Sequence, residues 1–327
     1  MEILVEMKDI CKIYNPGENE VRALDHVNLT IHRGEFVAII GQSGSGKSTL
    51  MNMIGCLDVP TSGSYILSGH DVSKLSDNQL SDIRNSEIGF IFQGFNLIAN
   101  LTARENVELP LIYRGVSQKE RHALSQQALA KVGLANRMTH KPSEMSGGQQ
   151  QRVAIARAIA QAPPVILADE PTGNLDSASS REILGILKAL YKDGRTVILI
   201  THDNGIAAQA KRIIRIMDGK IVEDRENPDA DLTAKSQPAV RTETRPATAA
   251  KPIPAAATQA TPATTAKPTP AAVAEPTPAA AAKPIPAAAT EAISAAATEA
   301  ISAAATQAIS AVQAETQPAD PAHNTEA

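Results

Sequence analysis

The sequence predicts an α/β protein with a covered parallel β-sheet, an antiparallel β part, an inserted α-helical subdomain and a disordered C-terminal tail. Three observations lead to this prediction. Short apolar runs recur without a polar face, as in strands that are covered on both sides. Longer stretches of helical character separate these runs, and the composition changes abruptly after residue 225.

The change in composition divides the 327-residue chain. All four Tyr and all four Phe precede residue 192, Trp is absent, and Ala, Pro and Thr dominate from Glu226 onward. Such a segment has too little bulky apolar surface to offset the entropy of ordering a core. We therefore expect one globular unit over residues 1–225, a linker over 226–250 and a low-complexity tail over 251–327.

The tail repeats every eight residues, beginning with Lys251. Its first five units contain Pro, which favours an extended chain, whereas the last three, from Glu291, lack Pro and permit a marginal helix. We expect a flexible tail without a function of its own. A tether or a partner-binding segment is the alternative.

The net charge and the two cysteines exclude few classes of function. The 31 Lys/Arg and 35 Asp/Glu give a net charge of −4, with the acidic surplus in the tail, so nothing favours nucleic acid as the main partner. Cys11 and Cys56 are not spaced as metal ligands and are expected to be reduced. No apolar run approaches 18 residues and the start lacks a basic signal-peptide region, so we expect the chain to stay in the cytoplasm without spanning a membrane.

The strands are recognised by alternation or by short apolar runs. They are expected at residues 3–7, 27–31, 36–40, 88–92, 165–168 and 197–200. A further pair of runs, 213–217 and 220–222, flanks Asp218 and Gly219 and predicts a hairpin.

The helical subdomain is expected at about residues 95–162. It should contain helices at 101–107 and 118–132, with Pro110 and Gly115 as breaks. Two further helices are expected, one running from Ser146 through Ile159 until Pro163 stops it, and one from Ser179 to Tyr191.

A glycine-rich loop lies between the run at 36–40 and a segment of helical composition. This order of strand, loop and helix is what a P-loop requires. Its glycines bring backbone N–H groups onto phosphate oxygens, Lys47 is suited to reach the β and γ phosphates, and Ser48 is suited to bind Mg²⁺. A plain Gly/Ser-rich turn is the alternative. The candidate phosphate-binding residues are Gly41, Gln42, Ser43, Gly44, Ser45, Gly46, Lys47, Ser48 and Thr49.

Polar residues follow four of the predicted strands. The strand ends lead into Gly41, Gln93, the pair Asp169 and Glu170, and the pair Thr201 and His202. Ligands of open α/β sheets bind beyond the carboxyl ends of the strands, so these groups should converge on one nucleotide. Adjacent strand residues point in opposite directions. Asp169 is therefore expected to serve Mg²⁺ and Glu170 to polarise the attacking water, with a solvated strand-end pair as the alternative.

A second anion-binding helix start is predicted at Ser146, Gly147, Gly148 and Gln149. The triphosphate of one nucleotide does not need two anion-binding helix N-termini. The second start is explained if it serves the nucleotide of another subunit, whereas an ordinary capped helix is the alternative.

With these motifs in order, residues 3–225 resemble an ATP-binding subunit of an ATP-binding cassette (ABC) transporter, a P-loop NTPase with a RecA-like core. The matching motifs are the Walker A residues Gly41–Thr49, the glutamine loop at Gln93, the signature Met145–Gln149, Walker B Val165–Glu170, the D-loop Gly173–Asp176 and the switch histidine His202. Met145 replaces the usual Leu. Further residues resemble the macrolide-exporter and lipoprotein-releasing group, namely Val21–Leu24, Gly55–Asp58, Glu108–Leu111 and Pro171–Asp176.

The resemblance implies a mechanism. Two copies sandwich two ATP molecules, each P-loop facing the partner's Ser146, Gly147 and Gly148. Tyr14 then stacks on adenine, Gln93 contacts Mg²⁺ and the attacking water, and His202 contacts the γ-phosphate. Hydrolysis is expected to drive a separate membrane permease at the cytoplasmic face of the inner membrane.

The sequence does not identify the partner proteins or the exported substrate. A periplasmic adaptor is a possible further partner, and the exported substrate is a drug, a peptide or a lipoprotein. The alternative function is an ATP-gated regulatory module that signals through a membrane protein, as in cell-division relatives. A soluble ABC protein acting on ribosomes or DNA is disfavoured, because such proteins usually carry two cassettes or a coiled-coil insertion.

Overall fold

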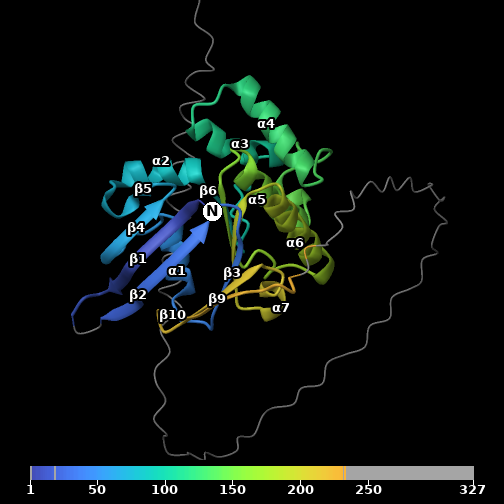
Figure 1. Ribbon diagram of the computed structural model, residues 1–327. Coiled ribbons are helices and arrows are strands. Elements are labelled where there is room, and N and C mark those ends of the chain that lie inside the picture. The colour runs from blue at the N-terminus through green and yellow to red at the C-terminus, as the bar shows by residue number, and fades with distance from the viewer. Residues whose placement is uncertain (1, 18–19, 231, 233–327) are drawn as a thin grey trace, which may run out of the picture. The chain divides into compact units, whose positions relative to one another are not determined.

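The computed structural model describes residues 2–17, 20–230 and 232 (Figure 1). Most of the expected linker and the whole low-complexity tail lie outside these residues, so the expectations for them stay predictions.

A six-stranded sheet forms the centre of the fold. Its order is β10-β9-β3-β8-β7-β6, and every neighbouring pair is parallel except the β9–β10 hairpin. The four predicted central strands are confirmed. The bounds are β3 Phe36–Ile40, β6 Ile88–Ile91, β7 Val165–Asp169, β8 Thr196–Thr201, β9 Arg212–Met217 and β10 Lys220–Glu226.

A second sheet is antiparallel and has the order β2-β1-β4-β5. The predicted strands at 3–7 and 27–31 are only parts of longer strands, because Asp9 and His26 adopt positive φ angles of 54° and 53° and the β1–β2 register shifts there. Such irregularities interrupt the alternation on which the prediction depends. The bounds are β1 Ile3–Tyr14, β2 Val21–His32, β4 Ser62–Leu67 and β5 His70–Asp71.

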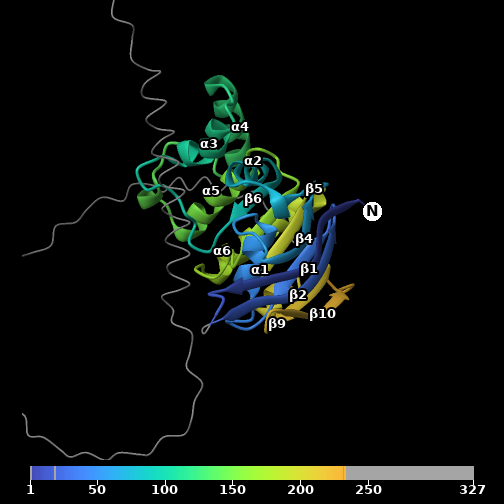
Figure 2. The same ribbon diagram turned by 90° about the vertical axis from the view of Figure 1, so that its left-hand side faces the viewer.

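The helices surround the six-stranded sheet, and in both views α3 and α4 lie at the end away from β1 and β2 (Figures 1 and 2). The α-helices are α1 Lys47–Ile54, α2 Asp77–Glu87, α3 Ala103–Tyr113, α4 Gln118–Lys131, α5 Gly147–Ile159, α6 Ser177–Lys192 and α7 Asn204–Ala207. Two short 3-10 turns are η1 Val72–Lys74 and η2 Pro142–Glu144.

The expectation that Pro110 ends a helix is wrong. Helix α3 continues through Pro110 and stops before Gly115, which has a φ of 71°. Val107 and Leu111 are buried on either side of the proline, so tertiary packing outweighs the local penalty of proline in a helix.

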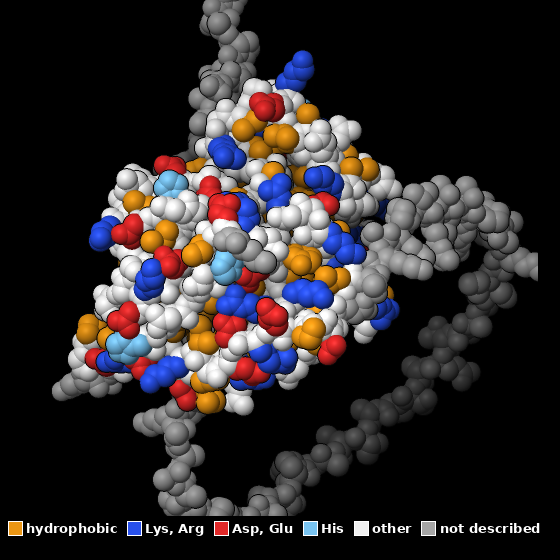
Figure 3. Space-filling model, in the orientation of Figure 1, with side chains coloured by type: hydrophobic (Ala, Val, Ile, Leu, Met, Phe, Trp, Pro, Cys, Tyr) orange, Lys and Arg blue, Asp and Glu red, His pale blue; other side chains and the backbone are white. Residues whose placement is uncertain are grey.

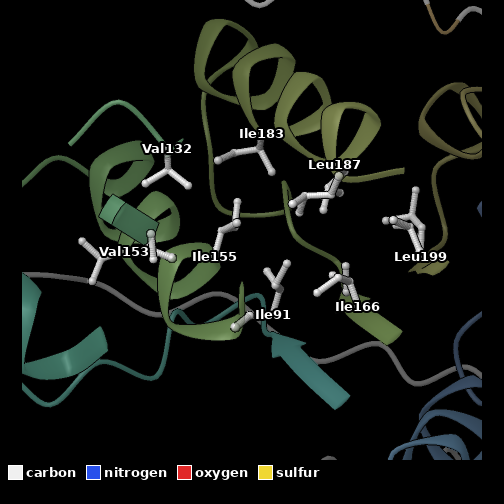
Figure 4. Packing of buried hydrophobic residues seen from close by; sticks show 14 of the residues in the cluster. Ile91, Val132, Val153, Ile155, Ile166, Ile183, Leu187 and Leu199 are labelled. Carbon is white, nitrogen blue, oxygen red and sulfur yellow. The ribbon is translucent and has the colours of Figure 1, made fainter. Parts of the chain in front are cut away.

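Two hydrophobic cores lie on the two faces of the central sheet. Alternate residues of β3 divide between them, with Phe36, Ala38 and Ile40 in one and Val37 and Ile39 in the other. The first core packs the sheet against α5 and α6, as the labelled Ile155, Ile183 and Leu187 show (Figure 4), and it also includes buried residues of α3 and α4. The second packs the sheet against α1 and the antiparallel strands. The sheet is therefore covered on both faces, as predicted.

Candidate active site

The carboxyl ends of β3, β8, β7 and β6 lie at one edge of the sheet, since these strands are parallel neighbours. They lead respectively into the P-loop, His202, Glu170 and Gln93. The predicted convergence of four strand ends is present in the fold.

The loop from Gly41 to Gly46 joins β3 to α1 in a conformation that only glycine permits at its critical points. A Cβ at Gly41 would lie 2.4 Å from the carbonyl oxygen of Ile216, and a Cβ at Gly46 would lie 2.6 Å from that of Ala23. Gly46 also has a φ of 101° and is the N-cap of α1. The positive end of α1 and the exposed loop residues Gln42, Ser43 and Gly44 therefore suit the binding of an anion.

The β9–β10 turn supports this loop from behind. The N–H of Gly219 donates to the carbonyl of Ser45 at 3.0 Å, and the N–H of Asp25 donates to the carbonyl of Gly219 at 2.9 Å. The Oγ of Ser45 is buried without a hydrogen-bond partner among the described residues. The hydrogen-bond donors of this loop therefore fit a polyphosphate, whose oxygens accept hydrogen bonds.

Lys47 folds back over the loop. Its Nζ donates to the carbonyls of Gly41 at 2.7 Å and Gln42 at 2.6 Å. Burial lowers the pKa of Lys47, while the nearby carboxylates of Glu170 and Asp169 raise it. The ammonium thus lies among the loop carbonyls and within the field of the Walker B carboxylates.

Asp169 ends β7 and Glu170 follows it in a left-handed conformation with a φ of 43°. The expectation that strand alternation orients Glu170 is therefore wrong, because a turn sets its direction. Burial, reinforced by the charge of Glu170, raises the pKa of Asp169 to about 6, and Lys47 opposes the shift. A divalent cation at this position would relieve the same repulsion.

Glu170 is held by the residues after β8. Its Oε1 lies 2.6 Å from Nδ1 of His202 and accepts the backbone N–H of His202 at 3.0 Å, and its Oε2 accepts the hydroxyl of Thr201 at 3.2 Å. The carboxylate therefore has a fixed direction, and the imidazole of His202 remains largely exposed.

Hydroxyl, carboxylate and amide oxygens are ligands that Mg²⁺ prefers. Ser48, Asp169 and Gln93 carry such oxygens at or after the ends of β3, β7 and β6. The donor set thus fits Mg²⁺ bound together with phosphates.

Gln93 is exposed and bonds reciprocally with the D-loop. Its Nε2 donates to Oδ1 of Asn174 at 3.2 Å, and Nδ2 of Asn174 donates to the carbonyl of Gln93 at 3.3 Å. Gly173 packs against the same side chain, and a Cβ there would lie 2.7 Å from Nε2 of Gln93, so a larger residue would displace the amide.

Ser146 caps α5 as predicted. Its Oγ accepts the N–H of Gln149 at 3.3 Å, and its own N–H donates to Oε1 of Gln149 at 3.0 Å. Gly148 packs against Ser179, where a Cβ would lie 2.5 Å from the serine Oγ. Within residues 2–17, 20–230 and 232, no hydrogen bond or ion pair joins Ser146–Gln149 to the P-loop.

Tyr14 lies at the end of β1, where sequence reasoning missed two of its partners. Its hydroxyl donates to Oδ2 of Asp58 at 2.9 Å, Nζ of Lys12 donates to Oδ1 of Asp58 at 2.6 Å, and the same Nζ lies 5.0 Å from the centre of the Tyr14 ring. Burial and then Asp58 raise the pKa of Tyr14 to about 12, while a hydrogen bond with Thr49 lowers it. The motif Gly55–Asp58 was noted in the sequence, but only the fold brings it to Tyr14.

The two cysteines are not bonded to each other. Cys11 and Cys56 are free and buried. Within the part of the chain that the structure describes, ligand atoms of Cys11, Asp25 and His26 lie within 4.8 Å of one another, a grouping that the spacing of the cysteines did not predict. Asp25 is paired with Lys220 and His26 with Asp9.

The visible surface mixes both charges, and in Figure 3 neither sign forms a continuous patch. Among the described residues, no helix is both long and apolar enough to cross a membrane.

Comparisons with known proteins agree with this geometry. Residues 24–173 match the family model described as ABC transporter. The chain is 56% identical over 227 residues to the macrolide export ATP-binding/permease protein MacB of Hyphomonas neptunium, covering 69% of this chain but 35% of that relative. The chain thus spans about a third of the length of the MacB relatives that it matches.

Two further similarities cover nearly the whole of the other protein. The uncharacterized ABC transporter ATP-binding protein YvrO of Bacillus subtilis is 53% identical over 221 residues, which cover 68% of this chain and 96% of that protein. The dimeric post-hydrolysis structure of the cassette MJ0796 bound to ADP and Pi matches with 48% identity and a TM-score of 0.64, over 68% of this chain and 98% of that one.

Proposed function

Because this chain belongs to the ABC transporter family of ATP-binding proteins and is an ATPase of that family, we propose that it works as a homodimer whose two copies enclose ATP and drive a membrane permease. One observation carries the proposal. The chain has one P-loop and one signature, and within the described residues no hydrogen bond or ion pair joins them. A signature start with two glycines and an exposed serine is then free to receive the nucleotide of a second copy.

The proposed roles follow from the site. The P-loop amides of residues 41–49 and the ammonium of Lys47 bind the phosphates, and Tyr14 stacks on adenine. Ser48, Asp169 and Gln93 hold Mg²⁺, which supplies positive charge to the phosphate oxygens when bound. Ser146, Gly147, Gly148 and Gln149 of the other copy close the site.

Glu170 is the proposed general base. Its carboxylate is oriented by Thr201 and His202, so it is able to accept a proton from the attacking water while His202 contacts the γ-phosphate. The left-handed conformation of Glu170 costs about 1 kcal/mol or more, an expense that functional sites often carry.

A mixing experiment tests the shared site. Lys47→Ala removes the phosphate-binding ammonium and Ser146→Arg blocks the signature, so each variant alone has two defective sites. A dimer of one Lys47→Ala chain and one Ser146→Arg chain has one site with both halves intact. We expect ATP hydrolysis to be nearly absent in each variant and to return when the two are mixed.

Two results separate this proposal from its alternatives. If one chain forms a complete site, mixing restores nothing. If the two copies do not associate, Glu170→Gln with ATP stays monomeric by light scattering, whereas we expect a dimer that dissociates when ATP is removed.

The membrane partner is proposed from the relatives, several of which are named as combined ATP-binding and permease proteins. We propose that this chain attaches to a permease at the cytoplasmic face of the inner membrane and supplies export with energy. An affinity-tagged Glu170→Gln chain, purified from detergent-solubilised membranes with ATP, should retain one integral membrane protein with a large extracytoplasmic domain. Its absence from both ATP-bound and ATP-free preparations would exclude a stable permease complex.

A further inference from the structure

The segment after Gln93 has an unusual backbone. Phe95 and Asn96 are consecutive non-glycine residues with positive φ angles of 62° and 50°. L-residues adopt this region at an energetic cost, especially when they are bulky, so surrounding structure must hold the pair in place.

Arg157 of α5 provides that hold. Its Nη1 donates to the carbonyl of Asn96 at 2.5 Å and its Nη2 donates to the carbonyl of Phe95 at 3.0 Å. The planar fork of a guanidinium suits two adjacent acceptors in a way that a lysine ammonium does not.

The charged guanidinium of Arg157 has these two carbonyls as its hydrogen-bond partners. Among the described residues Arg157 forms no salt bridge, whereas Arg152 on the same helix pairs with Glu182. Burial lowers the pKa of Arg157 to about 10, so the side chain stays protonated at neutral pH.

The held segment and Gln93, two residues before it, contact two elements of the proposed site. Gln93 bonds with Asn174 of the D-loop. The ring of Phe95 lies beside Gly147 of the signature, where a Cβ would be 3.7 Å from the ring Cζ. Helix α5 therefore carries the signature at its first turn and holds the segment after Gln93 near its last turn.

We propose that Arg157 is a positioning residue for ATP hydrolysis, which fixes Gln93 toward the nucleotide and Phe95 against the signature by holding the carbonyls of Phe95 and Asn96. The inference rests on the role proposed above for Gln93. Helix α5 then rigidly connects the segment after Gln93, which belongs to one nucleotide site, with the signature, which belongs to the other site.

Arg157→Met tests this with a closely matched control. Arg195 also donates to two adjacent carbonyls, those of Ala162 at 2.5 Å and Pro163 at 3.0 Å, and Ala162 likewise has a positive φ of 54°. No proposed site residue lies there. Arg157→Met should lower kcat about 10- to 100-fold, as misplaced catalytic groups do, and leave the affinity for a fluorescent ATP analogue within about twofold. Arg195→Met should leave both within about twofold.

A spectroscopic test does not depend on hydrolysis. The chain contains no Trp, so Phe95→Trp places one reporter in the held segment. Adding Arg157→Met should shift its emission to longer wavelength, and adding Arg195→Met should not. If Gln93→Ala leaves kcat unchanged while the emission still shifts, the proposed role of Gln93 fails and the positioning by Arg157 stands.

Arg157→Lys covers the case in which the Met variant does not fold. A single nitrogen reaches one carbonyl less well than a fork reaches two, so we expect a kcat between those of the wild type and Arg157→Met, with nucleotide affinity unchanged. A kcat within twofold of wild type for Arg157→Met overturns the proposal. If the Met variant is unfolded, a wild-type kcat together with wild-type emission in Arg157→Lys overturns the proposal. An equal loss of kcat in Arg195→Met also overturns it.

Discussion

Nδ1 of His202 lies 2.6 Å from Oε1 of Glu170, and the backbone N–H of His202 donates to the same oxygen at 3.0 Å. Loss of the imidazole should leave the carboxylate held only by that N–H and by the hydroxyl of Thr201, and should lower kcat about 10-fold or more, with ATP affinity little changed. Steady-state hydrolysis and equilibrium nucleotide binding of His202→Ala measure the two effects.

The chain supplies a matched control for that variant. His32 bonds Glu35 in the same manner, through Nδ1 at 2.7 Å and its backbone N–H at 2.9 Å, but away from the nucleotide site. His32→Ala should leave kcat within about twofold. Equal losses in the two variants would show that the effect of His202 is one of stability alone.

Glu170→Gln should abolish most hydrolysis while preserving binding. The amide keeps the shape of the side chain but is a poor proton acceptor, so kcat should fall about 10²- to 10⁴-fold. Single-turnover hydrolysis with bound ATP is the measurement. Brisk turnover by this variant would remove Glu170 from the role of general base.

Two glycine substitutions should have opposite effects on stability. Gly46→Ala places a Cβ 2.6 Å from the carbonyl of Ala23 at a φ of 101°, so it should destabilise the fold and weaken ATP binding. Gly185 lies within α6 and a Cβ there meets nothing within 4 Å, so Gly185→Ala should stabilise by about 0.5–1 kcal/mol. Chemical denaturation of both variants gives the comparison.

Asp58 should affect the adenine side of the site. Asp58→Asn weakens the acceptor for Tyr14 and Lys12, so the ring should lose its fixed position and ATP affinity should fall about 2- to 10-fold with kcat largely kept. Nucleotide titration measures this. Tyr113→Phe, at an exposed ring, is the control and should bind ATP like the wild type.

The same cluster predicts a pH dependence. The pKa of Tyr14 is about 12 in the folded state against 10.0 for an ordinary tyrosine, so the folded chain keeps a proton that the unfolded chain releases between these values. The free energy of unfolding should therefore decrease from pH 10 to pH 12. The decrease should be well below the ~2.7 kcal/mol that two pKa units represent, because Tyr14 is only partly buried. Denaturation of wild type and Tyr14→Phe over this range measures the difference.

The folded unit should end after the predicted boundary at residue 225. Nδ2 of Asn227 donates to the carbonyls of Ala208 and Ala210 at 2.9 and 2.8 Å, and Ala230 is buried. A chain ending after Leu232 should melt and hydrolyse ATP like the full chain. A chain ending after Arg225 should lose about 1–3 kcal/mol, and equal melting temperatures would show that Asn227 contributes nothing.

The central sheet and the P-loop were predictable because their signals are local. Runs such as Phe36–Ile40 are apolar throughout, and the glycine and lysine spacing after them has few other uses. The antiparallel strands were underestimated because β1 and β2 contain irregular positions at Asp9 and His26, where φ is positive. Pairing with the neighbouring strand holds these positions in place, and the residue pattern of one strand alone does not show that pairing.

The contacts that orient the site were not predictable for a different reason. Asp58 and Tyr14 are 44 residues apart, and Arg157 and Asn96 are 61 apart. Neither pair has a spacing that implies contact, so only the folded chain identifies them. Glu170 was singled out by its position after β7, but its direction comes from a left-handed turn and from His202.

The order of the central sheet also constrains the route by which the chain reaches its folded state during synthesis. β3, which leads into the P-loop, has β8 and β9 as its two neighbours, and both are made more than 150 residues later. The turn at Gly219 that supports the loop is made later still. A ribosome therefore completes the P-loop early, yet the nascent chain gains the proposed nucleotide site only when nearly the whole globular unit has emerged.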